Sequence, residues 1–151
     1  MQPADLAAIY AVQCAAYASD YHEPQAALAS HLAAGDGCCF VATRGAELLA
    51  YVFAHPWAGE PPQLHQALPA ADAADQLFVH DLAVHPAARR QGIADALWQA
   101  VLARAQATGL GELRLVAVQG AATFWLRAGF VRLAQAAPAC YGDALLMRRA
   151  L

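Results

Sequence analysis

"LAVHPAARRQGIA" (residues 82–94) combines the end of an apolar strand, a short basic loop and the first turn of a helix. Backbone N–H groups at a helix start have no partner within the helix, and the helix dipole places partial positive charge there. Gly92 lets a ligand approach the backbone closely, and Arg89 and Arg90 add positive charge beside it. The stretch therefore predicts a turn that binds an anion such as a phosphate.

The whole chain predicts one globular domain, residues 1–151. It has 151 residues, 60% of them apolar, which is enough for a single core. The net charge is −3 and the basic residues are not gathered in one segment, which argues against a nucleic-acid partner. No apolar run approaches the roughly 20 residues of a membrane span, and no basic segment precedes an apolar run at the N-terminus. We expect a cytoplasmic protein with no membrane partner.

The cysteines and most of the histidines give no metal motif. Cys14, Cys38, Cys39 and Cys140 show no Cys-x-x-Cys spacing, which favours reduced thiols over a zinc or dithiol site. His31, His65 and His85 have no partner at ligand spacing, so we expect surface or capping roles for them. The sequence predicts no metal site.

Hydrophobic periodicity and turn residues predict an α/β domain with a mixed sheet. The expected helices are 4–18, 24–34, 92–107 and 121–128, and the expected strands are 38–43, 47–55, 76–84, 112–118, 130–134 and 144–149. Residues 56–75 carry prolines at four positions and no sustained period, which predicts a long loop that takes part in binding.

Strand 76–84 is apolar on both faces, which predicts a central position in the sheet. His80 and Asp81 are adjacent on it. Strict alternation would place them on opposite faces, with His80 beside Phe78, unless a bulge intervenes.

Two segments resemble a known family. "HDLAVHPAARRQGIADALW" (80–98) and "VAVQGAATFWLRAGF" (116–130) resemble the two signature regions of the GCN5-related N-acetyltransferases (GNATs). The resemblance covers residues 38–149 clearly and extends to the first two helices. It implies a mixed, mostly antiparallel sheet flanked by helices, with a splay between the fourth and fifth strands of the family.

The resemblance also implies that acetyl-CoA binds as co-substrate. Its pyrophosphate would bind the amides of 89–94, and its pantetheine arm would run along 82–84. The implied cofactor-binding residues are Leu82, Ala83, Val84, Arg89, Arg90, Gln91, Gly92, Ile93, Ala94, Phe124 and Trp125.

The chain departs from the family pattern in three places. Trp125 stands where many members have a tyrosine that protonates the CoA thiolate, and an indole N–H is too weak an acid for that task. Val118 stands where an asparagine is common. The strand that usually precedes the first helix is absent or very short, because only residues 1–3 precede that helix.

Three residues are candidates for proton transfer. "VHDLAVH" resembles the "HVLAVH" segment of the arylalkylamine N-acetyltransferases, so His80 is the expected general base; the alternative is a core histidine bonded to a carbonyl. Asp81 is a candidate amine anchor or water-relay base, and alternatively part of an ion pair. Tyr141, in the turn before the last strand, is a candidate substitute acid, and alternatively a half-buried turn tyrosine.

The acceptor is the least determined part of the function. Tyr21, His55 and Trp57 are candidates for substrate binding because the first two helices and the start of the long loop lie near the acceptor in this fold. The resemblance implies direct transfer of acetyl to a primary amine, and the acidic balance favours a small molecule. A protein N-terminus or lysine, and a non-catalytic acyl-CoA sensor of the same fold, remain alternatives. Dimers are common in such folds, so a homodimer is compatible with the resemblance.

Overall fold

The computed structural model describes residues 1–35, 37–69 and 73–151. Its α-helices are α1 (Leu6–Ala16), α2 (Gln25–Ala34), α3 (Ile93–Gln106) and α4 (Ala122–Arg127), and its 3-10 helices are η1 (Pro3–Asp5), η2 (Ser19–Tyr21), η3 (Pro86–Ala88) and η4 (Ala139–Tyr141). Its strands are β1 (Phe40–Arg44), β2 (Glu47–Trp57), β3 (Gln76–Val84), β4 (Glu112–Ala117), β5 (Val131–Arg132) and β6 (Leu145–Ala150). No helix in the described ranges is long and apolar enough to cross a membrane.

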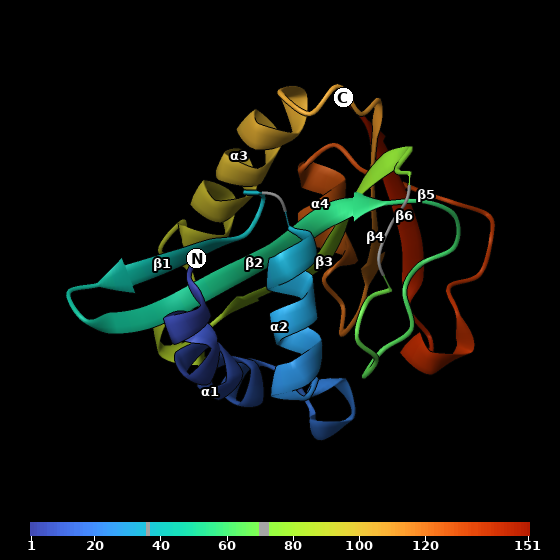
Figure 1. The fold of residues 1–151 in the computed structure, drawn as a ribbon. Helices are drawn as coiled ribbons and strands as arrows, with labels where there is room; N and C mark the ends of the chain where they lie inside the picture. Colours follow the sequence, from blue (N-terminus) through green and yellow to red (C-terminus); the bar gives the residue numbers. More distant parts are fainter. Residues whose placement is uncertain (36, 70–72) are drawn as a thin grey trace.

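The strands form one sheet in the order β1-β2-β3-β4-β6-β5 (Figure 1). Among the strands of the described ranges, only β3 and β4 run parallel; the other neighbours are antiparallel. β3 and β4 pair at two positions, Leu77 with Leu113 and Phe78 with Arg114, and then separate. The α/β class, the mostly antiparallel sheet and the splay between these strands are therefore confirmed.

Helices cover both faces of the sheet. α3 and α4 bury Trp98, Val101 and Trp125 against one face, in the larger apolar core. α1 and α2 cover the other face with Ile9 and Leu28, in a second core. The central strands are apolar on both sides, as the sequence predicts, because each face carries its own helical layer.

The boundary between β2 and the loop that follows it differs from the expected one. β2 continues through Trp57, because Pro56 and Trp57 pair with Leu77 and Gln76. The predicted loop therefore begins two residues later, and its residues 70–72 lie outside the described ranges. At the N-terminus, residues 1–5 form no strand before α1, only the 3-10 turn Pro3–Asp5.

A bulge in β3 changes the predicted faces of that strand. Phe53 of β2 pairs with Asp81, and the next residue, Ala54, pairs with Val79, so His80 is an extra residue without a partner on β2. A bulge of this kind shifts the alternation of side chains by one. The prediction that His80 and Asp81 face opposite sides is therefore wrong: both lie on the face that α1 and α2 cover, where their side-chain contacts are.

We predict that Gly35→Ala destabilises the fold by about 1–3 kcal/mol, the usual cost of overpacking. Gly35 follows α2, and a Cβ there would lie 2.3 Å from the Cys39 sulfur and 3.3 Å from the carbonyl oxygens of His31 and Ala54. Urea unfolding measures the change. Gly111→Ala is the control, since a Cβ at Gly111 meets no described atom within 4 Å; equal stability of the two variants would contradict the prediction.

Candidate active site

The loop before α3 is shaped by two left-handed residues. Gly92, with φ 75°, directly precedes the helix, and Arg90 has φ 60°. A Cβ at Gly92 would meet no described atom within 4 Å, so that side of the turn is open to a ligand. The Arg89 guanidinium donates to the Ala16 carbonyl oxygen at 3.2 Å, which ties the loop to α1. This turn has the backbone geometry and charge of an anion site.

A groove of about 230 Å³ begins beside this turn and runs along β3. Its walls include seven of the predicted cofactor residues: Leu82, Ala83, Val84, Arg89, Ala94, Phe124 and Trp125. The other four, Arg90, Gln91, Gly92 and Ile93, are in the turn itself, where the Gln91 side chain accepts a hydrogen bond from Arg44 at 2.8 Å. The predicted cofactor residues are therefore gathered at one place.

A larger cavity of about 320 Å³ continues from the groove into the gap between β3 and β4. The two share six wall residues: Ala16, Tyr17, Leu82, Arg89, Ala121 and Trp125. Val79 of β3 and Leu115 of β4 line the inner part, where the strands have separated. Groove and cavity thus form one cleft through the splay of the sheet.

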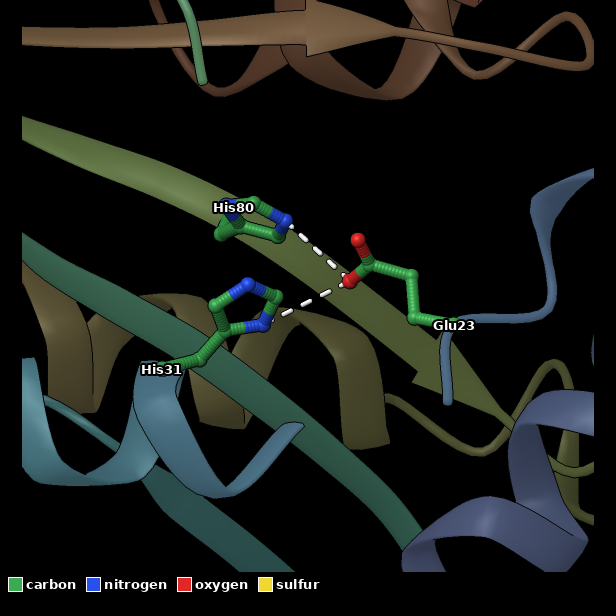
Figure 2. A group of neighbouring side chains, drawn as sticks. All are labelled: Glu23, His31 and His80. Atoms are coloured by element: carbon green, nitrogen blue, oxygen red, sulfur yellow. Dashed lines mark hydrogen bonds and ion pairs between the residues drawn. The ribbon is translucent and has the colours of Figure 1, made fainter. Parts of the chain in front are cut away.

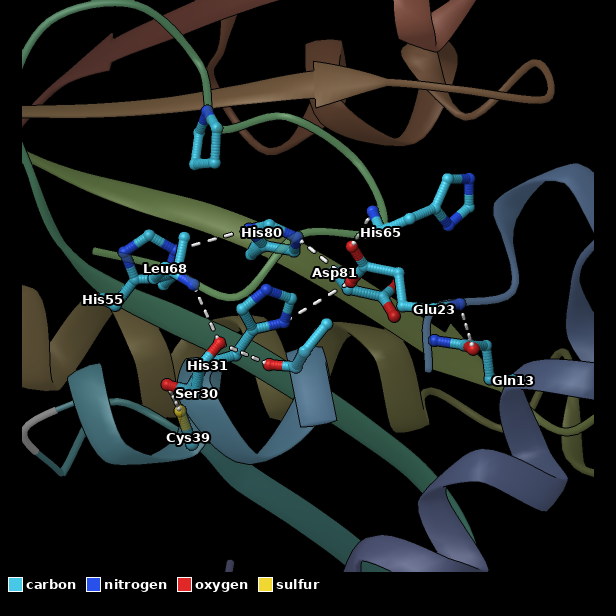
Figure 3. Close-up of polar contacts among 12 residues, drawn as sticks. Gln13, Glu23, Ser30, His31, Cys39, His55, His65, Leu68, His80 and Asp81 are labelled. Atoms are coloured by element: carbon cyan, nitrogen blue, oxygen red, sulfur yellow. Dashed lines mark hydrogen bonds and ion pairs between the residues drawn. The ribbon is translucent and has the colours of Figure 1, made fainter. Parts of the chain in front are cut away.

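His80 and Glu23 face each other in the wall of the larger cavity (Figures 2 and 3). His80 Nε2 lies 3.2 Å from Glu23 Oε2, and the side chains are 1% and 3% exposed. Glu23 precedes α2; its backbone N–H donates to Gln13 Oε1 at 2.7 Å, and its Oε1 accepts from the His65 backbone N–H at 3.0 Å. The carboxylate is therefore held in place independently of His80.

The hydrogen bonds of His55 determine the tautomer of His80. His55 Nδ1 lies 3.2 Å from the Pro56 carbonyl oxygen, which can only accept, so Nδ1 carries the proton. In neutral His55, Nε2 is then an acceptor, and its partner at 3.3 Å, His80 Nδ1, must donate. Neutral His80 consequently has its lone pair on Nε2, directed at the Glu23 carboxylate. This arrangement is ready to receive a cation, in the simplest case a proton.

Two further histidines are buried behind this pair. His31 and His55 are 0% exposed, and burial, with neighbouring histidines, lowers the pKa of His31 to about 2 and that of His55 to about 3. Both are therefore neutral near pH 7. The expected surface or capping role is wrong for His31, which is buried. It is confirmed for His85, whose Nδ1 accepts from the Ala87 N–H at 3.3 Å. It is also confirmed for His65, which is exposed.

Asp81 is held by two tyrosines. The Tyr17 hydroxyl donates to Asp81 Oδ1 at 2.6 Å, and the Tyr51 hydroxyl donates to Oδ2. Burial raises the pKa of Asp81, while the two hydroxyl donors act in the opposite direction. Burial and the Asp81 charge raise the pKa of both tyrosines well above its ordinary value, so both keep their protons. Asp81 joins α1 and β2 to β3 at the cavity wall.

The remaining predicted residues are divided between the cavity and its surroundings. Tyr21 and Tyr141 line the cavity, and the Tyr141 hydroxyl donates to the Pro62 carbonyl oxygen at 2.8 Å. Burial raises the pKa of Tyr141. His55 lies behind His80, and Trp57 lines a separate hollow formed by the long loop, so the structure separates both from the cavity wall.

Glu23 and His31 are the residues that the sequence did not single out. Glu23 lies between the first two helices, where only a general proximity to the acceptor was expected. The one available signal was a histidine within the apolar pattern of helix 24–34. Their contact with His80 depends on the tertiary packing of α2 over the sheet, where α2 lies against β2, and local periodicity does not encode this packing.

We predict that Tyr17→Phe destabilises the protein by about 1–3 kcal/mol, because the buried Asp81 oxygen and the Leu82 carbonyl lose their donor. Chemical denaturation measures this cost. Tyr10→Phe, which removes a hydroxyl from a more exposed residue of α1, serves as the control. A cost that persists undiminished in an Asp81→Ala background would show that the hydrogen bond to Asp81 is not its source.

Comparisons with known proteins identify the family and the fold. Residues 6–130 match the model of the acetyltransferase (GNAT) family. No curated protein matches the sequence. The Escherichia coli ribosomal-protein-S18-alanine N-acetyltransferase is similar in structure (19% identity, 99% of this chain and 90% of that chain, TM-score 0.73).

Two further similar structures contain coenzyme A or an acyl-CoA. One is the PaiA N-acetyltransferase of Thermoplasma acidophilum with coenzyme A (13% identity, 100% of this chain and 96% of that chain, TM-score 0.75). The other is the GNAT-like decarboxylase GphF with isobutyryl-CoA (16% identity, 99% and 96%, TM-score 0.79). Because the family model spans most of the sequence, this chain belongs to the GNAT family of acetyltransferases, and acetyl-CoA is its co-substrate.

Proposed function

We propose that the protein transfers acetyl from acetyl-CoA to a small primary amine by direct attack, with the His80–Glu23 pair as proton acceptor. The observation that carries the proposal is the continuous cleft, which joins the turn before α3 to the buried His80–Glu23 pair. The His80–Glu23 pair lies at the inner end of the route that the acyl arm of CoA would take. The reaction then needs no acyl-enzyme.

In this mechanism, an amine nitrogen attacks the thioester carbonyl carbon and loses a proton to His80 Nε2. Glu23 Oε2, 3.2 Å away, stabilises the imidazolium that forms. His55 holds the opposite side of the ring by accepting from Nδ1, so the lone pair is aimed before the amine arrives. The C–S bond then breaks as the tetrahedral intermediate collapses, and the CoA thiolate takes up a proton.

The proposed acid for the thiolate is Tyr141 or a water molecule. Tyr141 lines the cavity, but its hydroxyl proton is engaged with the Pro62 carbonyl oxygen. To act as acid, it would release this bond and turn toward the sulfur. Trp125, in the wall of both groove and cavity, would contact the thioester end.

The cavity favours an amine with an apolar substituent. Glu23 and Asp81 supply the acidic side chains that attract an ammonium, while Tyr21 and Leu64 offer apolar wall. A volume of about 320 Å³ suits a small ligand. The alternative function, from another class, is an acyl-CoA sensor without turnover. It stays open because Trp125 stands where many family members have the tyrosine that protonates the CoA thiolate.

We predict thiol release from acetyl-CoA with at least one member of a panel of small primary amines. His80→Ala should lower kcat by roughly 100-fold or more, the size of a general-base contribution, without changing the affinity for acetyl-CoA. Glu23→Gln should lower kcat as well, and the control Glu47→Gln, on the exposed start of β2, should not. A near-normal rate in His80→Ala would transfer the role to Asp81 or to water; tight CoA binding with no turnover on any amine would favour the sensor.

We also predict that Gly92→Val weakens CoA binding by at least about tenfold, because a branched side chain disfavours positive φ and fills the open side of the turn. Gly109→Val is the matched control: Gly109 has a similar φ of 76° and equally open surroundings beyond the far end of α3. Calorimetric titration with CoA compares the two. Equal affinities would disprove the role of the turn before α3.

A further inference from the structure

Three side chains of metal-ligand type, Glu23, His31 and His80, converge on one another (Figure 2). Glu23 Oε2 lies 3.2 Å from His80 Nε2 and 3.4 Å from His31 Nδ1. Within the described ranges, these three residues form the group whose ligand atoms all lie within 4.8 Å of one another. Two imidazoles and one carboxylate are a common ligand set for zinc.

The hydrogen bonding of the group is incomplete without a cation. His31 is 0% exposed, and neither of its ring nitrogens has a hydrogen-bond partner among the described residues, although Nδ1 is close to Glu23. A buried polar group without a partner is costly, and native structures rarely tolerate one. His80 directs a lone pair at the same carboxylate oxygen. A single proton can lie between Glu23 and only one of the two histidines. A metal ion can bind the Glu23 oxygen and one nitrogen of each histidine at the same time.

The distances fit a tetrahedral ion. Zinc binds imidazole nitrogen and carboxylate oxygen at about 2.0–2.1 Å, which places neighbouring tetrahedral ligands about 3.4 Å apart. Two of the three ligand separations, 3.2 and 3.4 Å, match this edge, and the third is within 4.8 Å. Glu23 and His80 also line the cavity, so a fourth position would face it and could hold water or an amine.

Outer contacts already orient two of the three ligands. The second carboxylate oxygen of Glu23 accepts from the His65 N–H, and His80 Nδ1 is bound to His55. Such contacts fix the ligand atoms and raise metal affinity. Nitrogen-rich ligands select zinc and related transition metals over magnesium and calcium, which prefer oxygen.

We propose that Glu23, His31 and His80 form a Zn²⁺ site, and that bound Zn²⁺ inhibits acetyl transfer by occupying the lone pair of His80. The inhibition rests on the function proposed above, because it requires His80 to accept the amine proton. The site itself does not depend on that function. A metal ion and the ammonium proton compete for the same nitrogen.

Competition with a chromophoric chelator tests the site in the metal-free chain, residues 1–151. Cys14 and Cys140 are replaced by serine first, because exposed thiols bind zinc on their own. We expect one Zn²⁺ per chain, and a visible spectrum typical of tetrahedral coordination when Co²⁺ replaces it. His31→Leu and Glu23→Gln should each weaken Zn²⁺ binding at least about 100-fold, the upper end of the effect of losing a supporting residue.

Circular dichroism and CoA binding show whether each variant is folded. If His31→Leu does not fold, Glu23→Gln still tests the site, because it keeps the volume of the side chain. The matched control is Glu47→Gln, which should leave Zn²⁺ affinity unchanged. Absence of stoichiometric binding, or equal affinity in parent and both variants, overturns the site.

The rate of acetyl transfer with and without one equivalent of Zn²⁺ tests the proposed inhibition. Each variant is compared with its own rate in the absence of zinc. We expect the parent to lose activity in proportion to occupancy, and His31→Leu to need at least about 100-fold more Zn²⁺ for the same loss. Zinc bound at these residues without inhibition contradicts the role of His80 as base and leaves the site standing. Lack of turnover on every amine contradicts the proposed function, while the chelator titration still decides the site.

Discussion

The structure of this site depends on one extra residue in β3. His80 has no partner on β2, so the strand places His80 and Asp81 on the same face and keeps its apolar residues buried on both sides. Without the bulge, one of the two polar side chains would lie on the face of the larger apolar core, which α3 and α4 cover. The bulge therefore allows a fully buried central strand to carry adjacent polar side chains toward one cavity.

The two polar groups so placed are stabilised in different ways. Asp81 accepts from two tyrosines and has a structural set of contacts that joins α1, β2 and β3. His80 is held by His55 on one side and faces Glu23 on the other, and close by is His31, whose ring nitrogens make no hydrogen bond with the described residues. Asp81 thus has its hydrogen bonds within the protein, whereas His80 Nε2 and Glu23 Oε2 face each other in the cavity wall. That difference is the physical basis for assigning chemistry to His80.

Much of the fold follows from local patterns. Strand 76–84, the glycine at the start of α3 and the apolar arcs of the helices are encoded in short stretches, and the structure has them close to the expected bounds. The residues predicted to bind the cofactor lie close together because they come from two short segments of the sequence. Glu23 and His31 were not, because their meeting with His80 depends on how α2 packs over the sheet. On the sequence alone, a bulge was only the exception that would bring His80 and Asp81 to one face. Nothing in "FVHDLAV" specifies which residue loses its partner.

The central claim, that His80 takes the proton of the amine at the inner end of the CoA cleft, is tested most directly by a crystal structure with CoA and an accepted amine bound together. The account predicts the amine nitrogen within about 2.6–3.2 Å of His80 Nε2, or joined to it by one water molecule, with the CoA sulfur in the gap between β3 and β4. An amine bound elsewhere in the cavity, with His80 shielded from it by protein atoms, would contradict the account.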